Sequence, residues 1–487
     1  MKILMLDLDT LRPDHMSCYG YERQTTPYMD EVARDGMRFD NYHCSDAPCL
    51  PSRAALVTGT FGIHNGAINH GDTTGDLRLF GKGREFHDQN LENDLFFLFR
   101  RKGLYTATVS SFAERHSSYW FNAGFNEVIN CGKRGDETAD DVLELTIKWL
   151  EENKNRSDWF LHVNMWDAHT PYRAPEEYGN PFENDPMPEW ITEEVFENHR
   201  KHVGPHSVNE LGMYWDSSPE GYPRQAGKAE TMEELKAVID NYDCDIQYMD
   251  SRIGKILQFL KENGDYEECA IIITSDHGEN MGELGIYSEH GTADEITTRI
   301  PMIIKWPGMK KGVDEELHYS LDLLPTLAEI FDLEPYGHWD GKSYAETLLH
   351  GEKCGRKYLV VSQGSHVCQR SVRFKNYIYI HTYHDGFHLF PKEMLFDLEK
   401  DYHEQKNLAD ERPDLCGEAC RYLVDWLHEM MMKSRTDIDP MWTVIREGGP
   451  YHAKGNLPMY CERLEKTGRS EGAKRLRELH PEEFCRI

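Results

Sequence analysis

Short strands that are apolar on both faces, separated by helices, constrain the fold of this 487-residue chain most strongly. Residues 2–8 (KILMLDL) and 269–275 (CAIIITS) lack the polar alternation of half-exposed strands, which is typical of strands buried on both sides. The same patterns predict further strands at 104–110 and 158–165, and helices at 27–36, 52–58, 91–102, 136–153 and 231–263. This alternation predicts an α/β fold with a large, mainly parallel mixed sheet flanked by helices on both faces.

The pattern changes twice along the chain. Residues 173–230 are rich in Pro, Glu, Asn and aromatic residues without a period, and we expect a substrate-framing insertion there. After residue 355, short strands predict a smaller antiparallel sheet packed by a helix at 411–433; these strands are 358–362, 371–381, 387–390 and 394–398. The tail, 440–487, is weakly patterned and is expected to pack back or to make a subunit contact. The chain is thus divided into a catalytic domain, 1–355, and a C-terminal subdomain, 356–487.

Composition limits the functional classes. The chain has 54 Lys and Arg against 85 Asp and Glu, a formal charge of −31, which disfavours nucleic acid and anionic lipid as partners. No apolar run reaches the roughly 18 residues of a membrane span. The first apolar run is broken at Asp7 and is too short for a secretory signal, so we expect a cytoplasmic protein. Its 12 cysteines include no C-x-x-C pair, and neither a zinc knuckle nor a disulfide framework is expected.

Carboxylate and imidazole groups follow three of the predicted strands. They are Asp7 and Asp9 at the end of the first strand, His169 after the strand at 158–165, and Asp276 with His277 after the strand at 269–275. Each of these polar strand endings, taken alone, is explained by a helix cap or a solvent-exposed turn. Because open α/β sheets place their sites at the carboxyl ends of strands, the three together predict a metal centre with an acid/base group. An oxygen-rich set with one imidazole suits Ca²⁺, Mg²⁺ or Mn²⁺ better than structural zinc.

The segment 44–59 (CSDAPCLPSRAALVTG) is the most specific motif in the chain. Cys49 stands just before an expected helix start, where backbone N–H groups and the helix dipole favour an anion. Arg53 lies one turn further and can bind the same anion with two parallel hydrogen bonds. A reduced cysteine packed under a helix cap is the alternative interpretation of this segment alone.

This segment, C-x-P-S-R followed by A-A-L-V-T-G, resembles the signature of the type I sulfatases within the alkaline phosphatase superfamily. The resemblance extends in family order over about residues 2–410. LDTLRPDHMSCYGY is similar to the family's first strand and loop, and YMDSRIGKILQFLKENG with CAIIITSDHGENMGE to its second metal segment. IPMIIKWPG, SLDLLPTLAEIF and LFDLEKDYHEQKNLAD resemble segments nearer the C-terminus. The resemblance is weakest at 173–230 and after 440.

The resemblance implies that a separate maturation enzyme oxidises Cys49 to formylglycine, whose hydrated aldehyde is the nucleophile. It implies that Arg53 holds this group, and that His169 and Asn69 contact the sulfate. His290 stands where most relatives carry a lysine beside the leaving-group oxygen. A histidine there is expected to act as a general acid at neutral pH.

The resemblance also implies one divalent metal held by Asp9, Asp276, His277 and the converted Cys49. Many relatives carry two adjacent aspartates at the first position, and here Asp7 is expected to provide the second carboxylate. The Asp-His pair at 276–277 is similar to that of choline sulfatases and phosphonate monoester hydrolases. We therefore expect Ca²⁺ first, with Mn²⁺ or Mg²⁺ as alternatives.

Together these features predict a cytoplasmic hydrolase of sulfuric esters. Its substrate is expected to be a small sulfated molecule, either a glycan or glycosaminoglycan fragment or a steroid or aryl sulfate. A maturation enzyme is an expected partner, nucleic acid and membrane are not, and a homo-oligomer is left open. The alternatives are a phosphonate monoester or phosphodiester hydrolase with the same centre, and a silent binding protein in which Cys49 stays a thiol. His116 either replaces a basic residue of arylsulfatases or lies on the surface.

Overall fold

A large sheet with the strand order β11-β2-β10-β7-β1-β6-β4-β5 forms the body of the molecule. The computed structural model describes residues 1–78, 91–435 and 438–485. The sheet contains β1 (Lys2–Leu8), β2 (Met37–His43), β4 (Tyr105–Val109), β5 (Glu127–Ile129), β6 (Trp159–Met165), β7 (Cys269–Ser275), β10 (Met302–Lys305) and β11 (Gly312–Tyr319). Only β10 runs antiparallel to its neighbours, β2 and β7. The predicted mainly parallel mixed sheet is confirmed.

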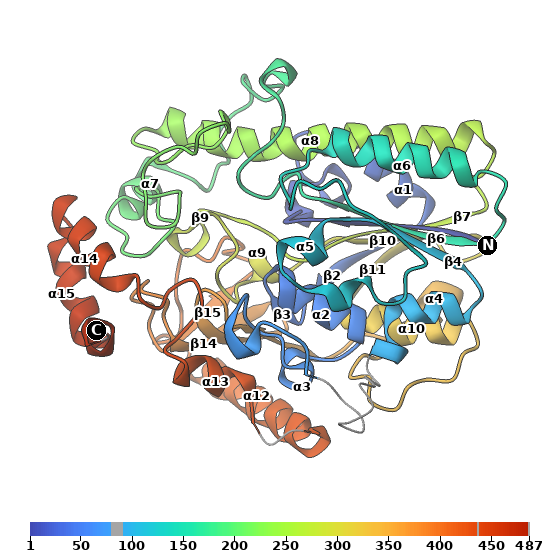
Figure 1. The fold of residues 1–487 in the computed structure, drawn as a ribbon. Coiled ribbons are helices and arrows are strands. Elements are labelled where there is room, and N and C mark those ends of the chain that lie inside the picture. Colours follow the sequence, from blue (N-terminus) through green and yellow to red (C-terminus); the bar gives the residue numbers. More distant parts are fainter. Residues whose placement is uncertain (79–90, 436–437, 486–487) are drawn as a thin grey trace.

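Helices cover both faces of this sheet (Figure 1). Leu4, Leu6 and Leu8 of β1 point to one core, whose helices are α1 (Pro27–Asp35), α6 (Ala139–Asn153) and α8 (Met232–Glu262). Ile3 and Met5 point to the opposite core, formed with α2 (Cys49–Thr58), α4 (Leu95–Arg101) and α10 (Leu323–Ile330). Because both faces are buried, the strand shows no polar alternation, as the sequence pattern indicated.

A smaller sheet with the order β15-β14-β13-β12-β3 lies beside the first. It contains β3 (Asp46–Ala47), β12 (Tyr358–Gln363), β13 (Cys368–Phe374), β14 (Tyr377–His384) and β15 (Glu393–Asp397), with α12 (Pro413–Lys433) packed on it. β12 to β15 pair antiparallel, whereas β3 pairs parallel with β12. The C-terminal sheet therefore includes the residues that directly precede the Pro48-Cys49 step.

Two sequence predictions in this sheet were wrong. The single strand expected at 371–381 is two strands, because Lys375 has a φ of 49° and reverses the chain. Residues 387–390 form no strand, because Phe387 and Leu389 have φ values of 71° and 57°, in the left-handed region.

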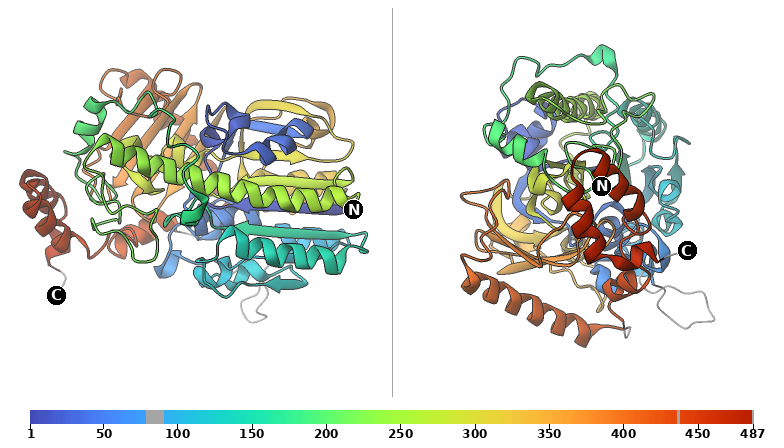
Figure 2. Two further views of the ribbon diagram at one scale, coloured as in Figure 1. Left: turned by 90° about the horizontal axis from the view of Figure 1, so that it is seen from above. Right: turned by 90° about the vertical axis from the view of Figure 1, so that its left-hand side faces the viewer.

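The insertion and the tail pack against each other at one end of the molecule (Figure 2). Within 173–230 the α-helical part is α7 (Glu193–His199). The tail forms α13 (Pro440–Arg446), α14 (Leu457–Lys466) and α15 (Ser470–Leu479), which the weak sequence pattern did not reveal. Gly204 N donates to Tyr460 Oη at 2.8 Å, and Arg469 pairs with Glu210 at 2.8 Å. The tail thus packs back onto the insertion.

Short elements complete the described chain: α3 (Gly62–Asn65), α5 (Phe112–Arg115), β8 (Asn280–Met281), β9 (Tyr287–Glu289), α9 (Glu295–Thr298) and α11 (Ala345–His350). None of the 12 cysteines is paired in a disulfide in the described residues. Among the helices of the described ranges, none combines the length and the apolar character needed to cross a bilayer.

Candidate active site

The first turn of α2 lies at the carboxyl ends of β1 and β7. Cys49 is the first residue of α2, so this helix begins two residues before Pro51 rather than after it. Ser52 Oγ donates to the carbonyl of Asp276 at 2.6 Å, which ties the helix to the loop after β7. Cys49 Sγ lies 3.1 Å from His277 Nε2, and its residue is only 1% exposed. The motif cysteine and the second predicted metal segment therefore meet, as expected.

Four potential ligand atoms converge beside this cysteine. One ligand atom each from Asp9, Cys49, Asp276 and His277 lies within 4.8 Å of the others, and all four residues are buried. Asp9 Oδ1 is buried without a hydrogen-bond partner. Buried polar atoms are normally paired, and an unpaired carboxylate oxygen among three further ligands is what a divalent cation requires. The donor set thus fits the metal that the sequence predicted.

Arg53 binds three carboxylates behind this group. Its Nε and Nη2 donate to Asp7 at 2.8 and 3.1 Å, and its Nη1 donates to Asp9 Oδ2 at 3.0 Å and to Asp276. Both oxygens of Asp7 are thus occupied, and Asp7 is not among the four converging residues. The sequence assigned Asp7 to the metal, whereas the geometry favours a role in orienting Arg53.

Two of the potential metal ligands hold protons near neutral pH in the metal-free protein. Burial and the neighbouring Asp276 carboxylate raise the pKa of Asp9 to about 7, against the opposing effect of Arg53. Burial alone would lower the pKa of His277, but Asp276 beside it raises that pKa well above the usual range. A metal that binds here must therefore displace protons from both residues.

His290 lies close to the centre and contacts two carboxyl groups. Its ring centroid is 4.1 Å from that of His277 and 5.2 Å from that of His169. Its Nδ1 lies 3.1 Å from Glu279 Oε2, and its Nε2 lies 3.2 Å from Glu289 Oε1.

The protonation of this group bears on its expected role as a general acid. Burial lowers the pKa of His290 to about 3, although Glu289 acts in the opposite direction. The imidazole is therefore neutral at pH 7 in the free protein. Burial and the nearby Glu289 raise the pKa of Glu279 well above the usual range, so this carboxyl holds a proton instead.

The other predicted residues lie around this centre. Asn69 accepts a hydrogen bond from the His70 backbone N–H, while its Nδ2 is buried without a partner. The His116 ring lies 4.9 Å from the Phe112 ring and 6.2 Å from the Trp166 ring, and its Nε2 is also buried and unpaired. His116 is thus half-buried rather than fully exposed.

Sequence reasoning missed Glu279, Glu289 and Arg115. The first two stand two residues after His277 and directly before His290, but only the fold brings them together. Arg115 lies over the Trp166 ring, 4.8 Å from its centroid, and helps to lower the pKa of the buried His169.

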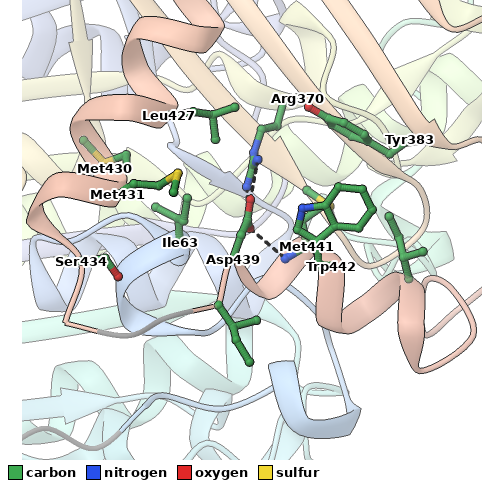
Figure 3. Close-up of a pocket in the computed structure, with 12 residues that line it drawn as sticks. Ile63, Arg370, Tyr383, Leu427, Met430, Met431, Ser434, Asp439, Met441 and Trp442 are labelled. Atoms are coloured by element: carbon green, nitrogen blue, oxygen red, sulfur yellow. Dashed lines mark hydrogen bonds and ion pairs between the residues drawn. The ribbon is translucent and has the colours of Figure 1, made fainter.

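An apolar cavity of about 520 Å³ lies elsewhere, between α12 and α13 (Figure 3). Met430, Met431, Met441 and Trp442 line it, and an Arg370–Asp439 ion pair lies at its wall. It shares no residue with the centre around Cys49, so it is not part of the candidate active site.

Comparison with known proteins agrees with this geometry. The model of the family described as Sulfatase matches residues 2–333. The chain belongs to the sulfatase family. This membership confirms the sequence-based assignment and makes the protein a hydrolase of sulfuric esters.

Known relatives cover most of this sulfatase. An arylsulfatase of Clostridium perfringens is 24% identical over 88% of this chain and 93% of its own. The crystal structure of the phosphonate monoester hydrolase of Agrobacterium radiobacter has a TM-score of 0.69 and 21% identity, covering 89% of this chain and 96% of that chain. A structure described in complex with its substrate D-glucosamine-2-N,6-O-disulfate has a TM-score of 0.70 and 19% identity, covering 90% and 99%. At these identities, the solved structures support the fold alone.

Proposed function

We propose that this sulfatase removes an O-sulfate group from a small sulfated sugar, with Cys49 as the precursor of its nucleophile. The observation that carries this proposal is the convergence of Cys49, Asp9, Asp276 and His277 at the N-terminus of α2. Formylglycine, the oxidised form of Cys49, would supply a hydrated aldehyde that attacks sulfur and later releases sulfate through its second hydroxyl. A divalent cation, Ca²⁺ by preference, would supply Lewis-acid charge at this point.

The residues of the chain position these groups. Asp9, Asp276 and His277 hold the cation, and Arg53 keeps the first two carboxylates in place. Asp7 in turn fixes the Arg53 guanidinium through two hydrogen bonds. His169, Asn69 and Arg115 are proposed to contact the sulfate, because their N–H groups can donate hydrogen bonds to developing negative charge.

We infer that the proton for the leaving alcohol passes through His290. Neutral His290 with its hydrogen on Nε2 can donate that hydrogen to the leaving oxygen. Nδ1 then takes the proton of Glu279, whose Oε2 lies 3.1 Å away. The two transfers balance: one proton goes to the alcohol, and one moves from Glu279 to the imidazole.

The His290→Gln variant should lose much more activity on alcohol esters than on aryl esters. A sugar alcohol is a poor leaving group and needs the proton, whereas nitrophenolate leaves without it. We expect kcat to fall about 100-fold or more for the sugar sulfate, and about tenfold or less for nitrophenyl sulfate. Steady-state kinetics of both substrates, with the exposed His350→Gln as a matched control, measures this difference. Equal losses on both substrates would remove His290 from proton transfer.

Metal affinity should depend strongly on pH. Because Asp9 has a pKa of about 7 and His277 is also protonated in the metal-free protein, binding releases protons. The affinity should therefore fall by about tenfold or more for each pH unit below 7. Calorimetric titration of the metal-free protein with Ca²⁺ and Mn²⁺ at pH 6 and 8, in buffers of different ionisation enthalpy, measures both quantities. A pH-independent affinity would contradict the protonation states described here.

The surroundings of the centre favour a sugar over a steroid. His169, His290, Glu289 and His206 are all buried polar residues on this side of the molecule. Such groups recognise hydroxyls and carboxylates by hydrogen bonding, and an apolar ring system would leave them unpaired. The apolar cavity of Figure 3, which could take a steroid, shares no residue with the centre.

The proposal is tested first by mass spectrometry of the peptide around Cys49, after expression with a maturation enzyme. Conversion of the thiol to the aldehyde removes about 18 Da. Protein that keeps an unmodified thiol, although the maturation enzyme converts a control peptide, would contradict the proposed nucleophile.

Phosphonate monoester hydrolysis remains the second candidate, because the Asp276-His277 pair differs from the Asp-Asn pair of many sulfatases. The alternative of a silent binding protein is disfavoured by the complete donor set around Cys49.

A further inference from the structure

A second group of imidazoles lies beside the candidate active site. His70 follows α3, His366 lies between β12 and β13, and His452 follows α13. One ring nitrogen of each lies within 4.8 Å of the others. We propose that this cluster, the three-histidine site, binds Zn²⁺ or a similar late first-row divalent cation in addition to the catalytic metal.

The ring nitrogens are placed as ligands of one ion would be. His70 Nδ1 and His452 Nε2 lie 3.0 Å apart. Two nitrogens on a tetrahedral Zn²⁺ are separated by about 3.3 Å, because each lies about 2.0–2.1 Å from the metal. The remaining nitrogen of His70, Nε2, is buried and has no hydrogen-bond partner. His366 stacks on His452 with ring centroids 4.3 Å apart, which completes the group.

The charge of the cluster also suits a cation. Burial lowers the pKa of His366 to about 4 and that of His452 to about 3, and it lowers the pKa of His70 as well. All three rings are therefore neutral at pH 7, which is the form that binds metals. Glu289 Oε1 lies 3.6 Å from His366 Nε2 and adds a negative charge beside the site. Ordered carboxylates next to ligating histidines are common in metal centres.

The segments that carry these histidines are already held together. Lys454 forms an ion pair with Asp72, and Thr73 donates a hydrogen bond to Glu447. The His452 backbone N–H donates to the Ser365 carbonyl at 3.0 Å. A metal would therefore join the C-terminal segment to the loop after α3 and to the small sheet. It would lie close to the leaving-group side, since the rings of His366 and His290 are 6.1 Å apart.

The experiment counts metal equivalents bound by the full-length protein. Protein stripped with a chelator is titrated with Zn²⁺ by calorimetry, and bound metal is measured after gel filtration. The His452→Ala and His70→Ala variants should each bind one equivalent fewer than the parent. The matched control His350→Ala, which removes an exposed imidazole from α11, should bind as many as the parent.

Cobalt gives a second measurement that does not depend on stoichiometry. Co²⁺ at a tetrahedral nitrogen site absorbs visible light strongly, whereas an oxygen-rich octahedral site absorbs weakly. We expect this strong absorption in the parent and in Cys49→Ala, and its loss in both cluster variants. Unchanged stoichiometry and absorption in His452→Ala would overturn the proposal. A raised KM together with unchanged metal binding would also overturn it, because the histidines would then only contact substrate. Neither measurement depends on maturation of Cys49 or on the proposed sulfatase substrate.

Discussion

Replacing Cys49 with alanine should abolish sulfate-ester hydrolysis while leaving the protein folded. The alanine side chain cannot be converted to an aldehyde, so no nucleophile remains at the N-terminus of α2. Loss of a catalytic nucleophile reduces kcat by about four orders of magnitude or more. Relative to the unconverted thiol, the folded state loses only one buried sulfur, worth about 1 kcal/mol. The melting temperature should therefore fall by no more than about 3 °C.

The matched control for this variant is Cys269→Ala. Cys269 is equally buried, but it begins β7 at the end of the strand remote from Asp276. We expect this variant to keep parental activity with a similar small change in melting temperature. Sulfate release by Cys49→Ala at more than one percent of the parental rate would show that another group is the nucleophile.

Replacing Arg53 with methionine should destabilise the protein more than any other single change at this centre. The change leaves Asp7, Asp9 and Asp276 buried without the guanidinium that pairs with all three. Breaking a buried ion pair in this way costs about 3–5 kcal/mol. The loss should be largest in metal-free protein, where no cation compensates for the carboxylates.

The pH dependence of this loss has a defined sign. In the parent, Arg53 opposes the effect of burial and keeps the pKa values of Asp7 and Asp276 below the usual range. The stability that these two groups contribute is present above their unfolded-state pKa of about 4, and it is lost as the pH falls through the folded-state values. Without Arg53, burial raises the folded-state pKa values of these carboxyl groups above the unfolded-state value, so the folded variant neutralises them by taking up protons at low pH. The deficit of Arg53→Met should therefore be larger at pH 7.5, where the unpaired carboxylates stay charged, than at pH 4.5.

Urea unfolding in a chelator at both pH values measures this effect. Arg53→Lys keeps a charge and should lose less. Arg134→Met, which removes an exposed partner of Glu114, should lose little stability. An unfolding free energy of Arg53→Met within about 1 kcal/mol of the parent at pH 7.5 would contradict the role assigned to Arg53.

The sequence pattern predicted the strands that carry the site residues, but not all of the strands that pair beside them. The uninterrupted apolar runs of β1 and β7 predicted burial on both faces, and the polar residues that follow them lie at one edge, as expected. β2 and β11 were missed, because MRFDNYH and GVDEELHY are polar segments whose residues are only partly buried. The tail helices were missed for a similar reason, since their short apolar faces are buried by distant segments. α14 and α15 pack against the insertion, the loop around Phe387 and one another, whereas α13 packs against Ile68 and Cys368.

Local sequence patterns do not predict which side chains meet when they come from segments far apart in the chain. Nothing in the spacing of His70 and His452, which are 382 residues apart, indicated that their rings meet. The same holds for Asp7, whose position beside Asp9 suggested metal binding until the Arg53 contacts were known. The protonation of His290 depends on burial and on Glu279 and Glu289, which only the fold reveals.

Hydrolysis of sulfuric esters at this centre is tested most directly with a matched pair of substrates. kcat/KM of fully matured protein is measured for 4-nitrophenyl sulfate and for 4-nitrophenyl phenylphosphonate, which share one leaving group. We expect a larger value for the sulfate, together with sulfate release from sulfated monosaccharides. A larger value for the phosphonate, without sulfate release from any sugar, would contradict it.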